Sequence, residues 1–248
     1  MGNLDNNALY GLLLSLGTFL LSMFLTPFYT HVAYKYHFWK KQKKTTVSGD
    51  GLPIMTKLHA HKFKRVFPTM AGIIGVISVT VVTLICNFDR AQTWLPIFGF
   101  LGGAIVGLID DGINVFGSGE GAAGLRAPIK FAMITVVSLV LGWFFAYKLG
   151  WTSIHIPFAG DIEIGGVVMV GLFTFAVVAT SNAVNISDGL DGLAGGLAMM
   201  AYGAFGTIAL FRGQVYLFAF CMTVVGWLFS YVWFNVPPAR FMMGDVGS

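Results

Sequence analysis

Five aspartates stand out as residues that could do chemistry, because they occur in polar or glycine-rich stretches of an otherwise apolar chain. They are Asp110 and Asp111 in LIDDGIN, Asp188 and Asp191 in SNAVNISDGLDGLAGG, and Asp245 in FMMGDVGS. Carboxylates are hard oxygen ligands of the kind that bind Mg²⁺ together with substrate phosphates. Acids near a helix C-terminus oppose the helix dipole, so Asp110 and Asp111 should need a positive partner rather than act as caps. These acids predict a metal and phosphate site.

The elements that must position these acids are membrane-spanning helices. Of the 248 residues 56% are hydrophobic and only 10% are charged, a composition too apolar for a soluble domain. A span needs roughly 20 apolar residues, and the absence of strict alternation in runs such as GVISVTVVTLIC argues against a β-barrel. We expect an all-α integral membrane protein, residues 1–248 forming one polytopic domain without a cleavable signal peptide. The seven expected spans are 8–33, 68–88, 93–109, 127–148, 165–181, 193–211 and 215–235.

The distribution of basic residues predicts the orientation of these spans. Twelve of the fifteen Lys and Arg residues fall on one side, nine of them between residues 34 and 67. The opposite side holds only Arg90, Lys148 and Arg212. By the positive-inside rule the 34–67 side is cytoplasmic and the N-terminus is extracytoplasmic. The five aspartates then all lie at the cytoplasmic ends of helices.

Three local features carry further expectations. Lys62 to Arg65 precede Pro68, which we expect at the first position of the second span, where cations beside a helix N-terminus favour phosphate binding. Cys86 and Cys221 lie in apolar segments without metal-ligand spacing, which predicts buried thiols. Residues 156–165 alternate in polarity, which predicts a short strand pair around Ala159 and Gly160.

Four stretches together resemble the polyprenyl-phosphate N-acetylhexosamine-1-phosphate transferases. They are KRVFPTMAG, LIDDGIN, SNAVNISDGLDGLAGG and FNVPPARFMMGDVGS, in the family's order, and they extend from about residue 60 to the end of the chain. The third stretch is long and specific to this family, whereas the Asp-Asp pair by itself is weak evidence for it. The resemblance also implies that residues 156–165 form an extracytoplasmic hairpin.

The resemblance implies transfer of a phospho-sugar from a UDP-linked amino-sugar donor to undecaprenyl phosphate, with release of UMP and with Mg²⁺ as the cofactor. The enzyme would lie in the bacterial cytoplasmic membrane among membrane lipids, with its active site facing the cytoplasm. It would serve peptidoglycan synthesis and would bind no nucleic acid, and a homodimer stays an open alternative. Because the family continues beyond the position of Ser248 with a His-rich loop and further helices, the chain is either a fragment or an incomplete enzyme.

The resemblance also implies roles for individual residues. Asp245 is expected to be the main Mg²⁺ ligand, with Asp110 and Asp111 around the metal and the lipid phosphate. Asp188 and Asp191 fall where the family holds the nucleoside. The remaining matches are cationic, hydroxyl or amide positions, namely Lys64, Thr69, Lys130, Asn182, Asn185 and Asn235.

Several alternatives stay open at this point. The SNAVN and GLRAPIKF stretches favour a muramoyl-pentapeptide donor, whereas Asn114 stands where a Lys is usual and favours an N-acetylglucosamine donor. A covalent route through Asp111 competes with direct attack by the acceptor phosphate. Outside this reaction class, the chain could be an inactive binding protein on the same fold. A transporter predicts acids near helix midpoints, whereas these acids are expected at helix ends.

The charge distribution yields a topology prediction. Single cysteines that replace Lys43 or Glu120 should react with a membrane-impermeant thiol reagent only from the cytoplasm, and a cysteine at Asp161 only from outside. Labelling of intact cells against inverted vesicles measures this directly. Cytoplasmic labelling at position 161 would contradict the predicted orientation.

Overall fold

The protein is an all-α bundle with one small β-hairpin in the computed structural model, which describes residues 2–39, 68–117 and 124–248. The long helices are α1 (Gly2–Lys35), α5 (Trp94–Phe116), α6 (Ala127–Trp143), α7 (Gly166–Ser187), α8 (Leu193–Phe211) and α9 (Val215–Asn235). The shorter elements are α4 (Gly72–Cys86), a π-helical turn η1 (Phe144–Lys148), β1 (Ser153–Ile156) and β2 (Gly160–Glu163).

Within the described residues, six helices are long and apolar enough to cross a membrane, counting α6 and η1 as one span. The second expected span appears as α4, which has only 15 residues. At 1.5 Å per residue it is about 22 Å long, shorter than a hydrocarbon core of about 30 Å. The expected all-α class is therefore confirmed. Instead of seven spans of full length, the described part of the chain has six helices long enough to cross a membrane and one shorter apolar helix.

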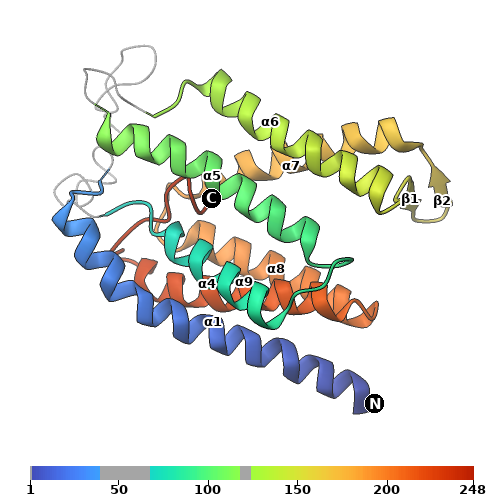
Figure 1. Ribbon diagram of the computed structural model, residues 1–248, viewed down its shortest axis with the longest axis horizontal. Coiled ribbons are helices and arrows are strands. Elements are labelled where there is room, and N and C mark those ends of the chain that lie inside the picture. Colours follow the sequence, from blue (N-terminus) through green and yellow to red (C-terminus); the bar gives the residue numbers. More distant parts are fainter. Residues whose placement is uncertain (1, 40–67, 118–123) are drawn as a thin grey trace.

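The helices run roughly along one direction, with α9 at the centre and the α6–α7 pair at the edge (Figure 1). In α9, 61% of the residues in the most apolar window are buried, against 11% in α7. The main core joins α1, α4, α9 and the segment after α9, and it contains Trp227, Leu228, Phe241 and Met243. The residues after Asn235 are thus part of the core.

Close helix contacts in this core depend on small residues. A Cβ atom added at Gly226 would collide with the main-chain oxygen of Ser15, and one added at Gly75 would collide with the indole of Trp227. The Ser22 hydroxyl donates to the Ser78 hydroxyl at 2.8 Å between α1 and α4. Small side chains and paired hydroxyls are the usual means by which apolar helices pack closely in membranes.

The connections alternate between the two ends of the bundle. The N-terminus, the α4–α5 loop and the β-hairpin lie at one end, and the α7–α8 loop lies at the other (Figure 1). The hairpin pairs Ile154 with Ile162 and His155 with Asp161 in antiparallel register, and its turn contains Ala159. The expected strand pair is confirmed.

Three sequence expectations about helix ends and burial are wrong. Helix α5 continues to Phe116, so Asp110 and Asp111 lie inside it rather than at its end. Helix α4 begins at Gly72, so Pro68 precedes it instead of opening it, because residues 68–71 pair with the segment after α9. Cys86 is exposed at the end of α4, whereas Cys221 is buried as expected.

Candidate active site

The site is built around a lysine that is shared by two aspartates. The Nζ atom of Lys130 lies 3.1 Å from Oδ2 of Asp110 and 3.0 Å from Oδ1 of Asp245. The two carboxylates are largely buried, with 9% and 11% of their side chains exposed. Charges removed from water need a partner of opposite sign, and Lys130 is the positive partner expected for Asp110. Asp110, Lys130 and Asp245, all predicted as site residues, are thus brought together.

Helix α6 places Lys130 within its first turn, beside Asp110 in α5. A cation at a helix N-terminus is disfavoured by the helix dipole, so Lys130 depends on the two carboxylates for compensation. The other oxygen of Asp110 accepts a hydrogen bond from the backbone N–H of Leu125 at 2.5 Å. Gly124, with φ of +80°, allows this close approach, because a Cβ atom there would lie 2.5 Å from Oδ1 of Asp110. The turn before α6 therefore wraps around Asp110.

Helix α7 contributes Asn185 to the same cluster. Its side-chain N–H donates to Oδ1 of Asp245 at 2.6 Å, the oxygen that also contacts Lys130. Asn185 was expected in the loop before the sixth span, but it lies in the last turns of α7, which ends at Ser187. Asp245 is thus held by side chains from two different helices.

Asp111 has a different environment from its neighbour. Successive residues of an α-helix point about 100° apart, and Asp111 faces the segment after α9. It is fully buried, and its Oδ2 atom accepts the backbone N–H of Val246 at 3.1 Å. Asp111 therefore anchors the residue next to Asp245.

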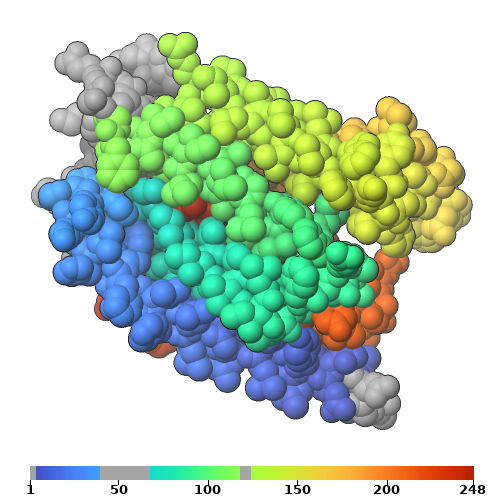
Figure 2. Space-filling view, in the orientation of Figure 1, coloured from blue at the N-terminus to red at the C-terminus, as the bar shows by residue number. Residues whose placement is uncertain are grey.

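The segment that carries Asp245 is attached to the beginning of α4 by main-chain hydrogen bonds. Met242 donates to the oxygen of Pro68 at 2.9 Å, and its own oxygen accepts the N–H of Ala71 at 3.1 Å. Gly72 donates to the oxygen of Met243 at 2.9 Å. From the side shown in Figure 2, α4 and α5 cover most of this segment, and only a small patch of it is visible between them.

The α7–α8 loop supports the same segment from another side. Asp188 accepts the N–H of Gly244 at 3.3 Å, and Asp191 accepts that of Ala239 at 3.4 Å. Asn235, at the end of α9, accepts the N–H of Gly192 at 2.7 Å and donates to the oxygen of Phe241 at 2.8 Å. These three predicted residues therefore contact the main chain that carries Asp245.

The remaining predicted residues are less closely connected to the cluster. Thr69 is buried, and its Oγ1 atom has no hydrogen-bond partner within the described ranges. The amide of Asn182 bonds to the oxygen of Val178 in its own helix at 2.8 Å. Lys64 lies outside the described residues.

Sequence reasoning missed two tyrosines that support the site. The Tyr231 hydroxyl accepts the N–H of Met243 at 3.0 Å, and the Tyr29 hydroxyl donates to the main-chain oxygen of Thr69. Tyr231 precedes Asn235 by one helical turn, so the shared helix face was an available signal. Tyr29 is distant in sequence from every motif, and no local pattern indicated it.

Asp110 and Asp245 are the predicted metal ligands that the structure brings close together. Within residues 2–39, 68–117 and 124–248, no group of three or more His, Cys, Asp or Glu side chains is arranged to hold a metal. Asp110 and Asp245 nevertheless present oxygens that lie at most about 6 Å apart, because both are about 3 Å from one nitrogen. Mg²⁺ commonly uses one or two carboxylates and takes its other ligands from water and phosphate.

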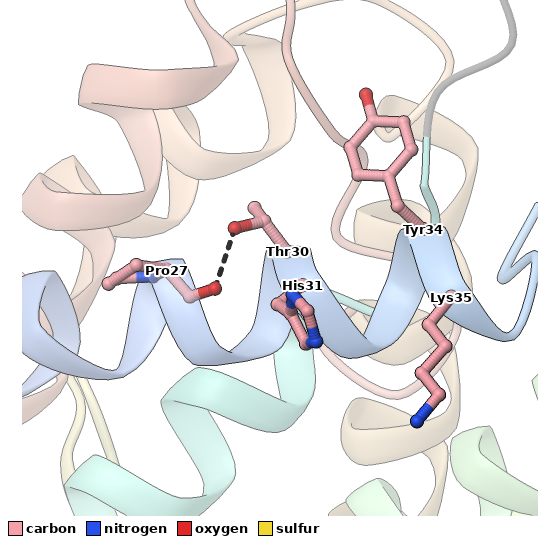
Figure 3. A pocket seen from close by; sticks show the side chains of 5 residues that line it. All are labelled: Pro27, Thr30, His31, Tyr34 and Lys35. Atoms are coloured by element: carbon pink, nitrogen blue, oxygen red, sulfur yellow. Dashed lines mark hydrogen bonds between the residues drawn. The ribbon is translucent and has the colours of Figure 1, made fainter.

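A separate hollow of about 500 Å³ lies along α1 and is lined by Pro27, Thr30, His31, Tyr34 and Lys35 (Figure 3). None of the five aspartates lines it. The hydrogen bond drawn there, from the Thr30 hydroxyl to the oxygen of Pro27, is internal to the helix. The acidic cluster and this hollow are therefore different places on the molecule.

The fold and the site define a polytopic membrane protein that joins two carboxylates through one lysine within an apolar helix bundle. Residues 93–248 match the family described as glycosyl transferase family 4, and the chain belongs to this family.

The chain is similar to several proteins named phospho-N-acetylmuramoyl-pentapeptide-transferase. It is 38% identical to the Lactobacillus helveticus protein over 192 residues, which cover 76% of this chain and 59% of the relative. It is 33% identical to the Chloroflexus aggregans protein over 245 residues, covering 96% of this chain and 64% of the relative. The chain thus spans about three fifths of the length of these relatives.

The contact between Gly107 and Asp245 gives a stability prediction. A Cβ atom at Gly107 would collide with the main-chain oxygen of Asp245, whereas one at Gly103, a helical turn earlier, has no atom within 4 Å. Gly107→Ala should therefore lower the free energy of unfolding by about 1–3 kcal/mol, as overpacking does, and Gly103→Ala should not lower it. Thermal unfolding in one detergent measures both variants. Equal stability of the two would contradict the close packing of this segment against α5.

Proposed function

We propose that the full-length protein transfers phospho-N-acetylmuramoyl-pentapeptide from its UDP-linked donor to undecaprenyl phosphate and releases UMP. This reaction forms lipid I in peptidoglycan synthesis. The observation that carries the proposal is the Asp110–Lys130–Asp245 cluster at the end of a helix bundle that is apolar on its outside. The family match and the names of the relatives support the same reaction class.

We place this reaction at the cytoplasmic face of the bacterial inner membrane, with the N-terminus outside and α4 as a short seventh span. The basic residues support this orientation. Arg126, Lys130 and Arg240 belong to the end of the bundle that carries the acidic cluster, whereas Arg90 and Arg212 belong to the opposite end. The nucleotide donor is water-soluble and the acceptor is a lipid, so a site at this boundary can reach both.

We further propose that the site uses Mg²⁺, held by Asp245 and Asp110 together with substrate phosphates. The ion would neutralise charge on the diphosphate as the bond to UMP breaks. Lys130 would then exchange part of its contact with the carboxylates for contact with a phosphate. Asn185 would keep Asp245 oriented through its 2.6 Å hydrogen bond.

The chain does not need a strong base for this reaction. The second pKa of a phosphate monoester is about 6, so the acceptor is largely a dianion at neutral pH. If a proton must be removed, Asp110 is the better candidate, because Asp111 is fully buried and bonds to Val246. The burial of Asp111 also favours direct attack by the acceptor phosphate over a covalent intermediate.

The other predicted residues have proposed roles that follow from their positions. Asp188, Asp191 and Asn235 would hold the nucleoside while they keep the segment of Asp245 in place. Thr69, with its buried hydroxyl, would contact phosphate or sugar. Lys64 and Asn182 complete the set of proposed polar contacts.

The assignment of the metal predicts the effect of neutralising one ligand. Asp245→Asn in the full-length protein should reduce transfer by at least about 100-fold, since a bound metal contributes several kcal/mol and each 1.4 kcal/mol is tenfold in rate. The fold should persist, because an asparagine oxygen can still accept from Asn185. Activity titrated with Mg²⁺ measures the loss.

Glu163→Gln, which neutralises an exposed acid of the hairpin, is the matched control for this variant and should keep normal activity. Near-normal turnover of Asp245→Asn would contradict the role of Asp245 as the metal ligand.

The choice of donor is a separate prediction. Asp110, Asp111 and Asp245 would meet only the diphosphate and metal that all donors share, so discrimination must come from groups that are left unpaired by the wrong donor. We expect the full-length enzyme to prefer the muramoyl-pentapeptide donor over UDP-N-acetylglucosamine when both compete for undecaprenyl phosphate. Exclusive use of UDP-N-acetylglucosamine would contradict this preference and would support the donor that Asn114 favours.

A further inference from the structure

The β-hairpin between α6 and α7 is amphipathic. Side chains alternate between the two faces of a strand, and residues paired across strands share a face. The pairing of Ile154 with Ile162 therefore places these two and Ile156 on one face. The pairs His155–Asp161 and Ser153–Glu163 place only polar side chains on the other. The His155 ring and the Asp161 carboxylate are 2.8 Å apart, which confirms that they share that face.

The apolar face of the hairpin is open to its surroundings in the described part of the chain. Ile156 and Ile162 are each 40% exposed. Phe158, in the turn, is fully exposed, and its φ of +71° is unusual for a bulky residue. An isolated two-stranded hairpin is only marginally stable in water, so an uncovered apolar face calls for an apolar environment.

The chain on both sides of the hairpin indicates what this environment is. Trp143 and Tyr147 before β1 and Val167 after β2 are 47%, 53% and 77% exposed on helices long enough to span a bilayer. Trp and Tyr are enriched where helices leave the hydrocarbon core. The hairpin projects beyond the ends of α6 and α7 (Figure 1). The hairpin thus directly joins two helix ends that expose apolar and aromatic side chains of the kind that face lipid.

We propose that the hairpin 153–163 lies on the bilayer surface as a lipid-binding element. Ile154, Ile156, Ile162 and Phe158 enter the boundary between headgroups and acyl chains, and the His155–Asp161 pair faces water. Because the polar face carries Asp161 and Glu163, apolar burial rather than attraction to anionic lipids drives this contact. The proposal is independent of the transfer reaction.

Adjacent residues on opposite faces provide a matched test. Single cysteines at Phe158, Ile162 and Glu163 are labelled with nitrobenzoxadiazole in the full-length protein, whose reactive native cysteines, Cys86 included, are replaced by serine. The protein is reconstituted in phosphatidylcholine vesicles that contain lipids spin-labelled near the headgroup. The emission of the labels at 158 and 162 should shift to shorter wavelengths, and the spin-labelled lipids should quench most of their fluorescence. The label at 163 should show neither effect. Phosphatidylglycerol in the vesicles should not change the result.

The other outcomes overturn the proposal. If none of the three labels is quenched or shifted to the blue, the hairpin lies in water. If all three are quenched equally, the two faces do not differ in their contact with lipid. A blue shift at 158 and 162 without quenching by lipid means that protein, such as a second copy of the chain, covers the apolar face.

A substitution in the apolar face gives an independent check. Ile156→Asp should abolish quenching of the label at 158, because a charge at the acyl boundary is unfavourable. Transfer activity should stay unchanged, since Ile156 is not part of the acidic cluster. Persistent quenching in this variant would also overturn the proposal.

Discussion

The site depends on the sharing of one ammonium group by two buried carboxylates. Asp110, Lys130 and Asp245 come from α5, α6 and the segment after α9, and the ammonium group of Lys130 compensates negative charge on both carboxylates. The interaction therefore couples the placement of three elements. It also holds one oxygen of each carboxylate within about 6 Å of the other, because both lie about 3 Å from the same nitrogen.

This arrangement is possible because main chains approach one another closely around Asp245. Gly107 lets α5 meet the main chain of Asp245, and Gly72 lets α4 meet Gly247. Gly244 has a φ of +78° and lies against the carboxylate of Asp111. At each of these positions a side chain would push the segment away from the helices. These glycines thus allow the segment that carries Asp245 to lie directly against the helices.

The bundle also separates its polar chemistry from its contact with lipid. Asp110, Lys130, Asn185 and Asp245 gather toward one end of the bundle, whereas further along their length α6 and α7 expose apolar side chains such as Val136 and Phe175. At the opposite end the same pair continues into the amphipathic hairpin. The polar cluster is therefore set apart from the apolar surface of the bundle.

The sequence by itself determined the all-α membrane class, the approximate positions of the helices, the hairpin and the set of acids, because these follow from composition, periodicity and local motifs. It also indicated that Asp110 needed a cation. The sequence did not show that Lys130 serves both Asp110 and Asp245, that Asp111 is buried against Val246, or that Tyr29 and Tyr231 support the site. Nor did it show that residues 68–71 pair with the segment after α9 instead of extending α4. Those outcomes join residues far apart in the chain, and only the packing of the helices brings them within hydrogen-bonding distance.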